Sequence, residues 1–251
     1  MPPFLDLRQS AAFVRGHAPE SVNIPLTELA SRMYELPEKG ASLRLFHDDP
    51  QELACALELL TNRGYQVSAI PTPALTVTGG SQQRLWRASP ILDEALTLTA
   101  QPGRALDLAC GSGRESVHLA TLGWHVDALD ILPDALQNAS ALAQHNGVTI
   151  HTIQHDLRKN ALPSASPYDL IIMLRYWHAP LMAGIIAALA PGGVLAVESF
   201  HPEDPYSRPG GHTVSTEYLA QEAAALKVKV LRVCPRNGRV FSQLIAVKEP
   251  S

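Results

Sequence analysis

The chain has 251 residues, 46% of them hydrophobic, and it carries a formal net charge of −4 at pH 7. This length and composition predict one large or two small globular domains and argue against disorder. The negative charge argues against a general nucleic-acid-binding surface, and the lack of any run of about 18 apolar residues argues against a membrane span. Three cysteines without metal-ligand spacing predict a reduced protein, which we expect in the cytoplasm.

Short strands and helices alternate through the first part of the chain, which predicts a small parallel-sheet domain over residues 1–70. Hydrophobic periodicity and turn residues place strands at 4–7, 22–26, 43–46 and 65–70. The helical patterns lie at 11–15, 27–36 and 53–62.

Two segments of this domain resemble the signature of the rhodanese-like family. They are residues 6–8, Asp-Leu-Arg, and residues 16–26, Gly-His-Ala-Pro-Glu-Ser-Val-Asn-Ile-Pro-Leu. In that family the loop after the strand expected at 43–46 begins with a sulfur-carrying cysteine, and the corresponding residue here is His47. An imidazole cannot carry a persulfide, and Asp48 and Asp49 would repel an anionic sulfur donor. The resemblance therefore implies a catalytically inactive module that serves packing, a protein partner or dimerisation.

Residues 71–89 have the composition of a linker, with two prolines and a Gly-Gly pair. Within it, residues 84–87 (Arg-Leu-Trp-Arg) are interpreted as a docking piece or a lid. Ser89 and Pro90 then predict the N-cap and first residue of a helix that opens a second domain over residues 90–251.

The second domain shows a regular alternation of strands and helices. We expect strands at 105–108, 125–130, 149–153, 168–174 and 194–200, with helices at 114–122, 133–145 and 180–189. Two more strands, 227–234 and 240–248, flank Asn237-Gly238, which is a strong hairpin signal. The pattern predicts a doubly wound, mostly parallel seven-stranded sheet that ends in an antiparallel hairpin.

A glycine turn follows the first of these strands, and acids follow three strand ends. Gly111 and Gly113 lie between a strand and a helix, which is typical of nucleotide-binding α/β domains, but Ser116 stands where a dinucleotide fingerprint needs its third glycine. Asp107, Asp130 and Asp156 each sit at or just after a strand end. In a doubly wound sheet these ends line one crevice, so the three carboxylates should converge there.

An acid-lined crevice suits S-adenosylmethionine better than a pyrophosphate, because this molecule presents a sulfonium, an ammonium, ribose hydroxyls and an adenine amine. Asp130 is placed to accept hydrogen bonds from the ribose hydroxyls, and Asp156 from the adenine amine. Ile131 and Leu157 would enclose the adenine ring. Asp107 would support the methionine end through the glycine turn or through bound water.

Two segments resemble motifs of the class I S-adenosylmethionine-dependent methyltransferases. Residues 106–113, Leu-Asp-Leu-Ala-Cys-Gly-Ser-Gly, are similar to motif I, with Ala109 at the usual first glycine, and residues 190–195, Ala-Pro-Gly-Gly-Val-Leu, are similar to the segment before strand five. The resemblance spans about residues 90–251 and implies S-adenosylmethionine as cofactor. The cofactor-binding candidates are Asp107, Ala109, Gly111, Gly113, Asp130, Ile131, Asp156, Leu157 and Arg175.

Aromatic, basic and histidine side chains follow the fourth and fifth strands, where the acceptor pocket should lie. Arg175, Tyr176, His178 and His201 are the catalytic candidates, and either histidine has the chemistry to deprotonate an acceptor. An alternative is that this cluster only packs against the cofactor. Glu198 and Tyr206 are further pocket candidates, residues 202–212 are expected to form a cover, and the histidines are too scattered to predict a metal site.

The leading hypothesis is therefore a methyltransferase that acts on a small-molecule acceptor by in-line displacement. The absence of an Asn/Asp-Pro-Pro-Tyr/Phe signature after the fourth strand argues against methylation of nucleic-acid bases. A second hypothesis is a non-catalytic S-adenosylmethionine-binding regulator whose rhodanese-like domain docks a partner. A third, a nucleotide-dependent oxidoreductase, is disfavoured by Ser116 and by the terminal hairpin.

Overall fold

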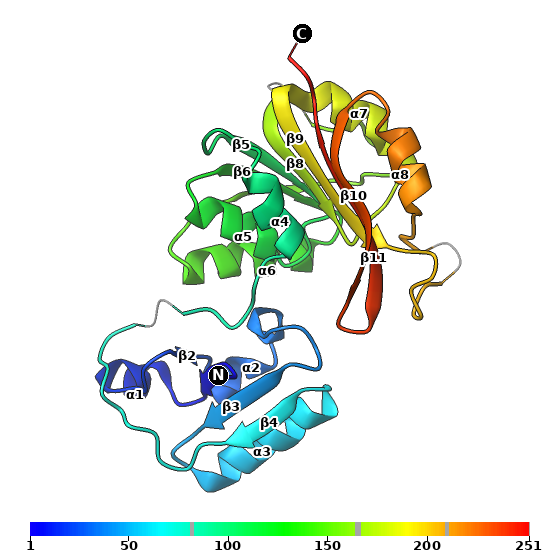
Figure 1. The fold of residues 1–251 in the computed structure, drawn as a ribbon. Coiled ribbons are helices and arrows are strands. Elements are labelled where there is room, and N and C mark those ends of the chain that lie inside the picture. Colours follow the sequence, from blue (N-terminus) through cyan, green and yellow to red (C-terminus); the bar gives the residue numbers. More distant parts are fainter. Residues whose placement is uncertain (81–82, 164–166, 209–210, 251) are drawn as a thin grey trace. The chain divides into compact units, whose positions relative to one another are not determined.

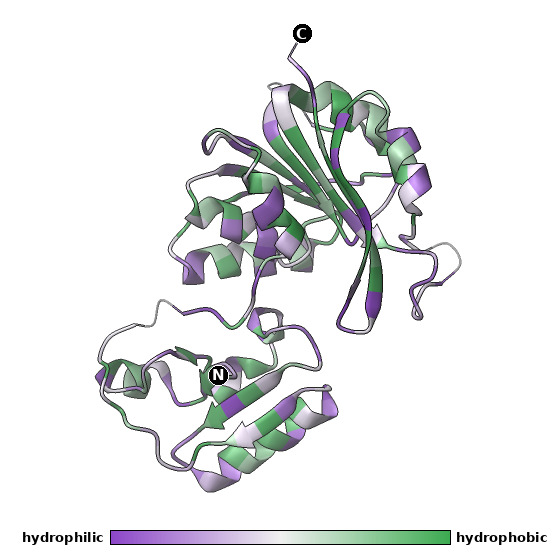
Figure 2. Cartoon of the chain, viewed as in Figure 1, coloured by the Kyte–Doolittle hydropathy of each residue, from purple (hydrophilic) through white to green (hydrophobic). Residues whose placement is uncertain are grey.

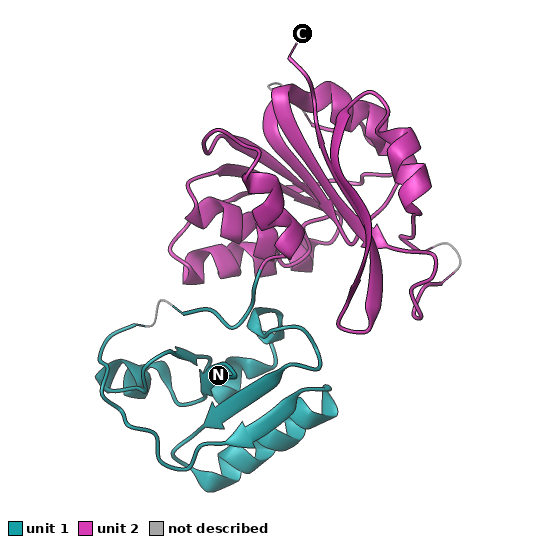
Figure 3. Cartoon of the chain, viewed as in Figure 1, with its two compact units in different colours: residues 1–87 teal, residues 88–251 magenta. Residues whose placement is uncertain are grey.

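The chain forms two compact units, residues 1–87 and 88–251, each with its own sheet and hydrophobic core (Figure 3). This computed structural model describes residues 1–251 apart from 81–82, 164–166, 209–210 and 251. Within the described part of the chain, no helix has the length and apolar character needed to cross a membrane.

The first unit is built on a parallel four-stranded sheet in the order β2-β1-β3-β4, which matches the expected small parallel sheet. The strands are β1 (Phe4–Asp6), β2 (Ser21–Asn23), β3 (Ser42–Phe46) and β4 (Gln66–Ala69). The helices are α1 (Ser10–Arg15), α2 (Leu26–Leu29), the 3-10 turn η1 (Met33–Glu35) and α3 (Pro50–Asn62).

The prediction of one helix over residues 27–36 is wrong, because only α2 and the separate turn η1 form there. Leu36 is extended, with φ −78° and ψ 159°, and Pro37 follows it. A residue before proline is driven out of the helical region, so the segment ends in a short turn. Leu36 is fully buried in the core of the unit.

Side chains from segments 6–8 and 16–26 join neighbouring backbone segments of the first unit. Asp6 is fully buried and forms an ion pair with Arg8, with 2.7 Å between Arg8 Nη2 and Asp6 Oδ2. The same Arg8 nitrogen donates to the Gly16 carbonyl at 2.8 Å, and the Asn23 side chain donates to the carbonyls of Asp6 and Arg8. These contacts join β1, β2 and the end of α1, so the motif has a structural role that needs no catalytic loop.

Part of the expected linker belongs to the first unit. Val77 pairs with His17 in an antiparallel bridge, and Leu85 packs in the core with Leu5 and Leu7. The Arg84 guanidinium lies 5.1 Å from the centroid of the Trp86 ring. Ser81 and Gln82 lie outside the described residues.

The second unit contains a seven-stranded sheet in the order β10-β11-β9-β8-β5-β6-β7 (Figure 1). The strands are β5 (Arg104–Leu108), β6 (His125–Asp130), β7 (His151–Gln154), β8 (Tyr168–Leu174), β9 (Leu189–Phe200), β10 (Lys227–Arg236) and β11 (Arg239–Val247). The strands from β9 to β7 are parallel, whereas β11 is antiparallel to both β9 and β10. The mostly parallel sheet with a terminal hairpin is thereby confirmed.

Helices cover both faces of this sheet. They are α4 (Pro90–Leu96), α5 (Arg114–Thr121), α6 (Pro133–His145), the turn η2 (Ala179–Leu181), α7 (Met182–Ala188) and α8 (Thr216–Glu222). The sequence interpretation missed α8, although Ser215 caps it by accepting a hydrogen bond from the Tyr218 N–H. The sequence also predicted the fifth strand only from residue 194, whereas β9 begins at Leu189.

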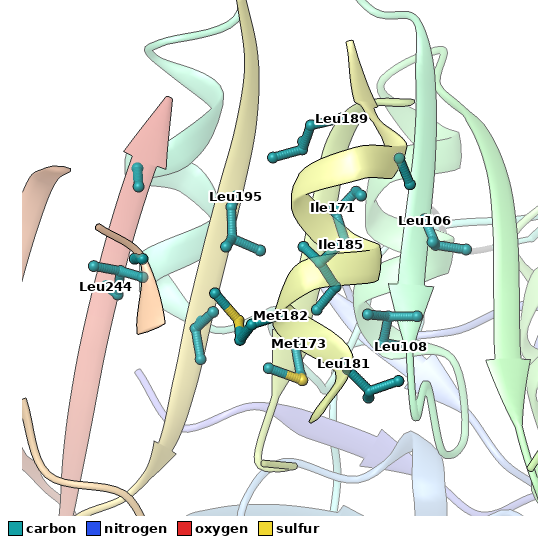
Figure 4. Packing of buried hydrophobic residues seen from close by; sticks show 14 of the residues in the cluster. Leu106, Leu108, Ile171, Met173, Leu181, Met182, Ile185, Leu189, Leu195 and Leu244 are labelled. Atoms are coloured by element: carbon teal, nitrogen blue, oxygen red, sulfur yellow. The ribbon is translucent and has the colours of Figure 1, made fainter. Parts of the chain in front are cut away.

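The central strand β8 shows how the two faces are filled. Ile171 and Met173 pack with Ile185 of α7 on one face, whereas Leu170 and Ile172 pack on the opposite face against α4 and α5. Figure 4 shows the α7 side, and Figure 2 shows the hydrophobic central strands. A central parallel strand buried on both faces reads as a continuous apolar run, which is why β8 is recognisable in the sequence.

Glu198 is not an acceptor-pocket residue, because its side chain is fully buried in a polar cluster that joins β9, β10 and β11. Arg236 donates to both of its carboxylate oxygens at 3.0 and 3.1 Å, and Gln243 donates at 2.6 Å. Ser89 donates to the same carboxylate at 3.1 Å rather than capping α4 with its side chain. Ser89 is the N-cap residue of α4 and Pro90 lies at its start, as expected, but the hydroxyl caps no backbone N–H and instead ties α4 to the sheet.

Arg236→Met should destabilise the second unit strongly, because it leaves the Glu198 carboxylate buried without its cation. Breaking such a pair costs about 3–5 kcal/mol. Lys227→Met is the matched control on the same strand, since Lys227 pairs with Glu249 at the surface, where a pair contributes about 0–1 kcal/mol. Urea denaturation of both variants makes the comparison, and equal losses would contradict the structural role of Glu198.

Candidate functional site

The candidate site is a crevice at the carboxyl ends of the parallel strands, on both sides of the point where the strand order reverses between β5 and β8. It contains two adjoining hollows. Hollow A has a volume of about 460 Å³ and includes Asp130, Ile131, Asp156 and Leu157. Hollow B has a volume of about 330 Å³ and includes Gly111, Glu115 and Arg175. Ala109, Tyr176 and His212 line both hollows, so the two are continuous.

Asp130 at the end of β6 is held in one orientation by the backbone. Its Oδ2 accepts a hydrogen bond from the Gly111 N–H at 2.8 Å, and its Oδ1 accepts one from the Leu132 N–H at 2.9 Å. The residue is 8% exposed and lines hollow A. Each carboxylate oxygen has a second lone pair, so Asp130 can still accept hydrogen bonds from a ligand in hollow A.

The turn after β5 brings the backbone close to both hollows. Ala109, Gly111 and Gly113 all have positive φ, at 59°, 56° and 75°. A Cβ on Gly111 would meet no atom within 4 Å, so the space beside it is open, whereas one on Gly113 would lie 2.6 Å from the Ala139 Cβ. Gly113 thus permits close packing of α5 against α6 rather than ligand contact. The backbone at position 109 is left-handed, a conformation that favours glycine, and alanine adopts it here.

Asp107 lies beneath the turn and does not line either hollow. Its carboxylate accepts a hydrogen bond of 2.5 Å from Ser116 Oγ, which fixes the first turn of α5. Burial and the neighbouring Glu115 raise the pKa of Asp107 to about 7, although the Ser116 hydrogen bond and Arg175 oppose this shift. Asp107 therefore stabilises the glycine turn from its buried side.

Glu115 and Arg175 form an ion pair at the wall of hollow B. The Arg175 Nη2 atom lies 3.2 Å from both Glu115 carboxylate oxygens, and Glu115 is only 4% exposed. Arg175 itself has a left-handed backbone, with φ 61°, immediately after β8. The sequence interpretation identified Arg175 but missed Glu115, since an acid in the first turn of a helix is ordinarily solvated.

Asp156 and Leu157 follow β7 and face Ile131 across hollow A. The backbone N–H of Arg158 donates to Asp156 at 3.0 Å, and this hydrogen bond, together with Lys159, lowers the pKa of Asp156. The neighbouring His155 was missed by the sequence interpretation. Its Nε2 atom is buried beside the hollow without a hydrogen-bond partner among the described residues.

Tyr176 and His212 meet where the two hollows join. Their ring centroids lie 4.4 Å apart, and the His212 Nδ1 atom lies 3.2 Å from the Trp177 carbonyl oxygen. A carbonyl oxygen only accepts hydrogen bonds, so Nδ1 carries a proton and Nε2 is the acceptor nitrogen of the neutral ring. His212 lies far beyond β9 in the sequence, and the bridge between Phe200 and Thr213 brings it back to the site.

The structure separates the two histidines proposed as proton acceptors. His178 lines the adjoining hollow C, which has a volume of about 410 Å³ and shares His212 with hollows A and B. His201 lines none of these hollows, and its Nδ1 accepts a hydrogen bond from the Glu203 N–H. Within the described residues, no group of three or more potential ligands is arranged to hold a metal ion.

The expected cover over residues 202–212 is anchored at its beginning. Asp204 is buried, and its carboxylate pairs with Arg239 at 2.9 Å and accepts from the Val240 N–H. Tyr206 is largely exposed and, like His201, does not line the crevice. Pro209 and Gly210 of this segment lie outside the described residues.

Comparison with known proteins gives matches to methyltransferases. A family model described as a methyltransferase domain matches residues 105–193. A protein-L-isoaspartate O-methyltransferase of Xanthomonas euvesicatoria pv. vesicatoria (strain 85-10) is 29% identical over 184 residues, which cover 70% of this chain and 78% of that protein.

Solved structures share the fold. TehB from Haemophilus influenzae aligns with a TM-score of 0.55 and 16% identity over 65% of this chain and 63% of its own. A Burkholderia thailandensis 1,6-didemethyltoxoflavin-N1-methyltransferase, solved with that substrate and S-adenosylhomocysteine, aligns with a TM-score of 0.52 and 21% identity over 64% of this chain and 77% of its own. At these identities the likeness concerns the fold.

The crevice fits S-adenosylmethionine chemically. Its ribose hydroxyls and adenine amine suit the carboxylates of Asp130 and Asp156 in hollow A, its charged methionine end suits the Glu115–Arg175 pair in hollow B, and its elongated shape suits two adjoining hollows. The open space beside Gly111 and the unpartnered Nε2 of His155 both indicate room for a polar ligand. S-Adenosylmethionine is therefore the cofactor that the sequence led us to expect.

The Asp107→Asn variant should gain stability relative to the wild type as pH rises. The folded-state pKa of Asp107, about 7, exceeds the value of about 3.9 for an unfolded aspartate, so folding takes up a proton. The stability due to this group is complete below pH 4 and is lost as pH rises through 7. The melting temperature of the variant minus that of the wild type should therefore increase between pH 5 and pH 8.

Asp127→Asn is the control of opposite sign. Hydrogen bonds from His151 and Tyr168 outweigh burial and lower the pKa of Asp127, so its contribution is present at neutral pH and is lost on acidification. A melting-temperature difference for Asp107→Asn that stays flat from pH 5 to pH 8 would contradict the raised pKa.

Proposed function

We propose that this chain, an S-adenosylmethionine-dependent methyltransferase, transfers the methyl group to a small-molecule acceptor. The observation that supports the proposal most is the continuity of hollows A, B and C around His212, since a donor site and an acceptor site must meet at the transferred methyl group. Carboxylates line hollows A and B but are absent from the described lining of hollow C, and the hollows are of small-molecule size.

Hollow A is proposed to hold the adenosyl part of the cofactor. The Asp130 carboxylate, already fixed by two backbone N–H groups, would accept from the ribose hydroxyls. Asp156 would accept from the adenine amine, with Ile131 and Leu157 on the two sides of the ring. Ile131 is half exposed in the absence of a ligand, which an adenine ring would change.

Hollow B is proposed to hold the methionine part. Gly111 allows the backbone to approach it, and the Glu115–Arg175 pair offers both charges to a group that is itself zwitterionic. Because Asp107 and Gly113 lie beneath the surface of the turn, we assign them to shaping this hollow rather than to contact.

The bound cofactor supplies an activated methyl group, so the chain's main tasks are to orient the acceptor and to exclude water. Tyr176 and His212 lie where the acceptor must approach. For a hydroxyl or amine acceptor, Nε2 of His212 would take the proton, because Nδ1 is committed to the Trp177 carbonyl. His178 would face the acceptor from hollow C, whereas His201 has no role in this scheme.

The first unit is proposed to be a rhodanese-like module without sulfur transfer, available for a protein partner or a dimer contact. On this resemblance, His47 stands where the rhodanese-like family has its sulfur-carrying cysteine. The N-terminus of α3 beside it is capped by Asp49, whose carboxylate accepts from the Gln51 and Glu52 N–H groups. A carboxylate already fills the place where an anionic substrate would bind. The three free cysteines agree with a reducing, cytoplasmic location.

Asp130→Asn should weaken S-adenosylmethionine binding about 10- to 100-fold, the effect of removing charge from hydrogen bonds worth about 1.5–3 kcal/mol. The asparagine oxygen can still accept one backbone hydrogen bond, so the turn should survive. Isothermal titration calorimetry measures the change. Asp127→Asn is the control, because Asp127 lies on the same strand but pairs with Arg104 and His151 outside the crevice.

Turnover is tested with a labelled methyl donor and a panel of small hydroxyl, amine, thiol, halide and metalloid acceptors. We expect label in at least one small-molecule product, and we expect His212→Asn, which keeps a donor near the Trp177 carbonyl, to reduce that rate. Cofactor binding without any turnover would favour a regulatory module instead. Preferential binding of NAD would contradict the methyltransferase assignment.

A further inference from the structure

Hollow C differs from hollow A in the acids of its lining: hollow A combines Asp130 and Asp156 with Arg158 and Lys159, whereas hollow C has no acid among its described lining residues. Its lining residues are Arg158, Trp177, His178, Ala179, Gly211 and His212, among which there is no acid. The undescribed residues nearest in sequence, 164–166 and 209–210, are Ser, Ala, Pro and Gly, so they add no charge. Hollow A, by contrast, contains the carboxylates of Asp130 and Asp156.

Arg158 is held by its backbone while its side chain remains available. Its N–H donates to Asp156 at 3.0 Å, which fixes the start of the segment that separates hollows A and C. Among the described residues, its guanidinium has no hydrogen-bond or ion-pair partner. A planar guanidinium in such a position matches a carboxylate or a similar anion with two parallel hydrogen bonds.

A smaller apolar space continues from hollow C. Hollow D, of about 270 Å³, shares Arg158 and His178 with hollow C and is lined by Leu157, Leu162 and Leu181. It contains no acid either. Hollows C and D together therefore offer a cationic wall, the Trp177 ring and an apolar recess, which suit a molecule with an anionic group and an apolar body.

We infer that hollow C receives the methyl acceptor and that this acceptor is a small organic anion, bound by Arg158 and His178. The inference rests on the proposed function, which assigns the donor to hollows A and B. The anionic group is drawn away from the carboxylates of hollow A and toward the Arg158 guanidinium, which lines hollow C as well as hollow A and faces no acid among the described lining residues of hollow C. The His178 ring offers a hydrogen-bond donor beside it. The reactive end of the acceptor then lies toward His212, which all three hollows share.

The test uses matched acids and amides, with hydroxybenzoates and short hydroxyalkanoates set against their neutral amides. Their binding to the full chain, saturated with S-adenosylhomocysteine, is measured by ligand-observed NMR titration. We expect at least one acid to bind about ten-fold more tightly than its amide, the range of a charge-assisted hydrogen bond. Arg158→Gln should abolish this preference, and Arg158→Lys should keep part of it.

Two further variants separate the acceptor site from the cofactor site. His178→Asn should weaken acid binding without changing the affinity for S-adenosylhomocysteine, because His178 lines neither hollow A nor hollow B. Lys229→Gln, which removes a charge from β10 outside the hollows, should change neither.

The outcomes are distinguishable from failure of the proposed function. If S-adenosylhomocysteine does not bind, the proposed function itself fails. If it binds but no acid does, or amides bind as tightly as acids, or Arg158→Gln leaves the preference intact, the anionic-acceptor inference is overturned while the methyltransferase assignment stands.

Discussion

The hydrogen bond from the Gly111 N–H to the Asp130 carboxylate links the ends of two neighbouring parallel strands and sets the form of the crevice. This hydrogen bond fixes the glycine turn on the side of hollow A. The hydrogen bond between Ser116 and Asp107 fixes the turn on its buried side. A carboxylate held by backbone donors needs no rearrangement to meet a ligand. The site is thus preorganised by the fold of β5 and β6, and the rest of the crevice is built around this pair of strand ends.

Charge separation follows from that arrangement. The strand ends of β6 and β7 provide carboxylates to one hollow, whereas the segments after Asp156 and after β8 provide Arg158 and His178 to the next. An anionic acceptor would meet no carboxylate in the described lining of hollow C, whereas the donor would meet Asp130 and Asp156 in hollow A. His212 lies at their boundary, in an orientation set by its contacts with Tyr176 and the Trp177 carbonyl.

The donor side of the site is predictable from the sequence because parallel strands end at one edge. The convergence of Asp130 and Asp156 therefore follows from recognising the strands alone. The acceptor side is less predictable. His212 reaches the site only through a bridge after β9, and Glu198, which a strand-end argument also selects, points into a buried cluster with Arg236. Sequence reasoning places a residue along a strand, but tertiary contacts decide which side chains face the crevice.

A crystal structure of the chain with S-adenosylhomocysteine tests the account most directly. The account predicts the ribose hydroxyls within hydrogen-bond distance of Asp130, the adenine ring between Ile131 and Leu157, and the sulfur atom directed toward Tyr176 and His212. A ligand bound elsewhere, or one in this crevice whose ribose makes no contact with Asp130, would contradict it.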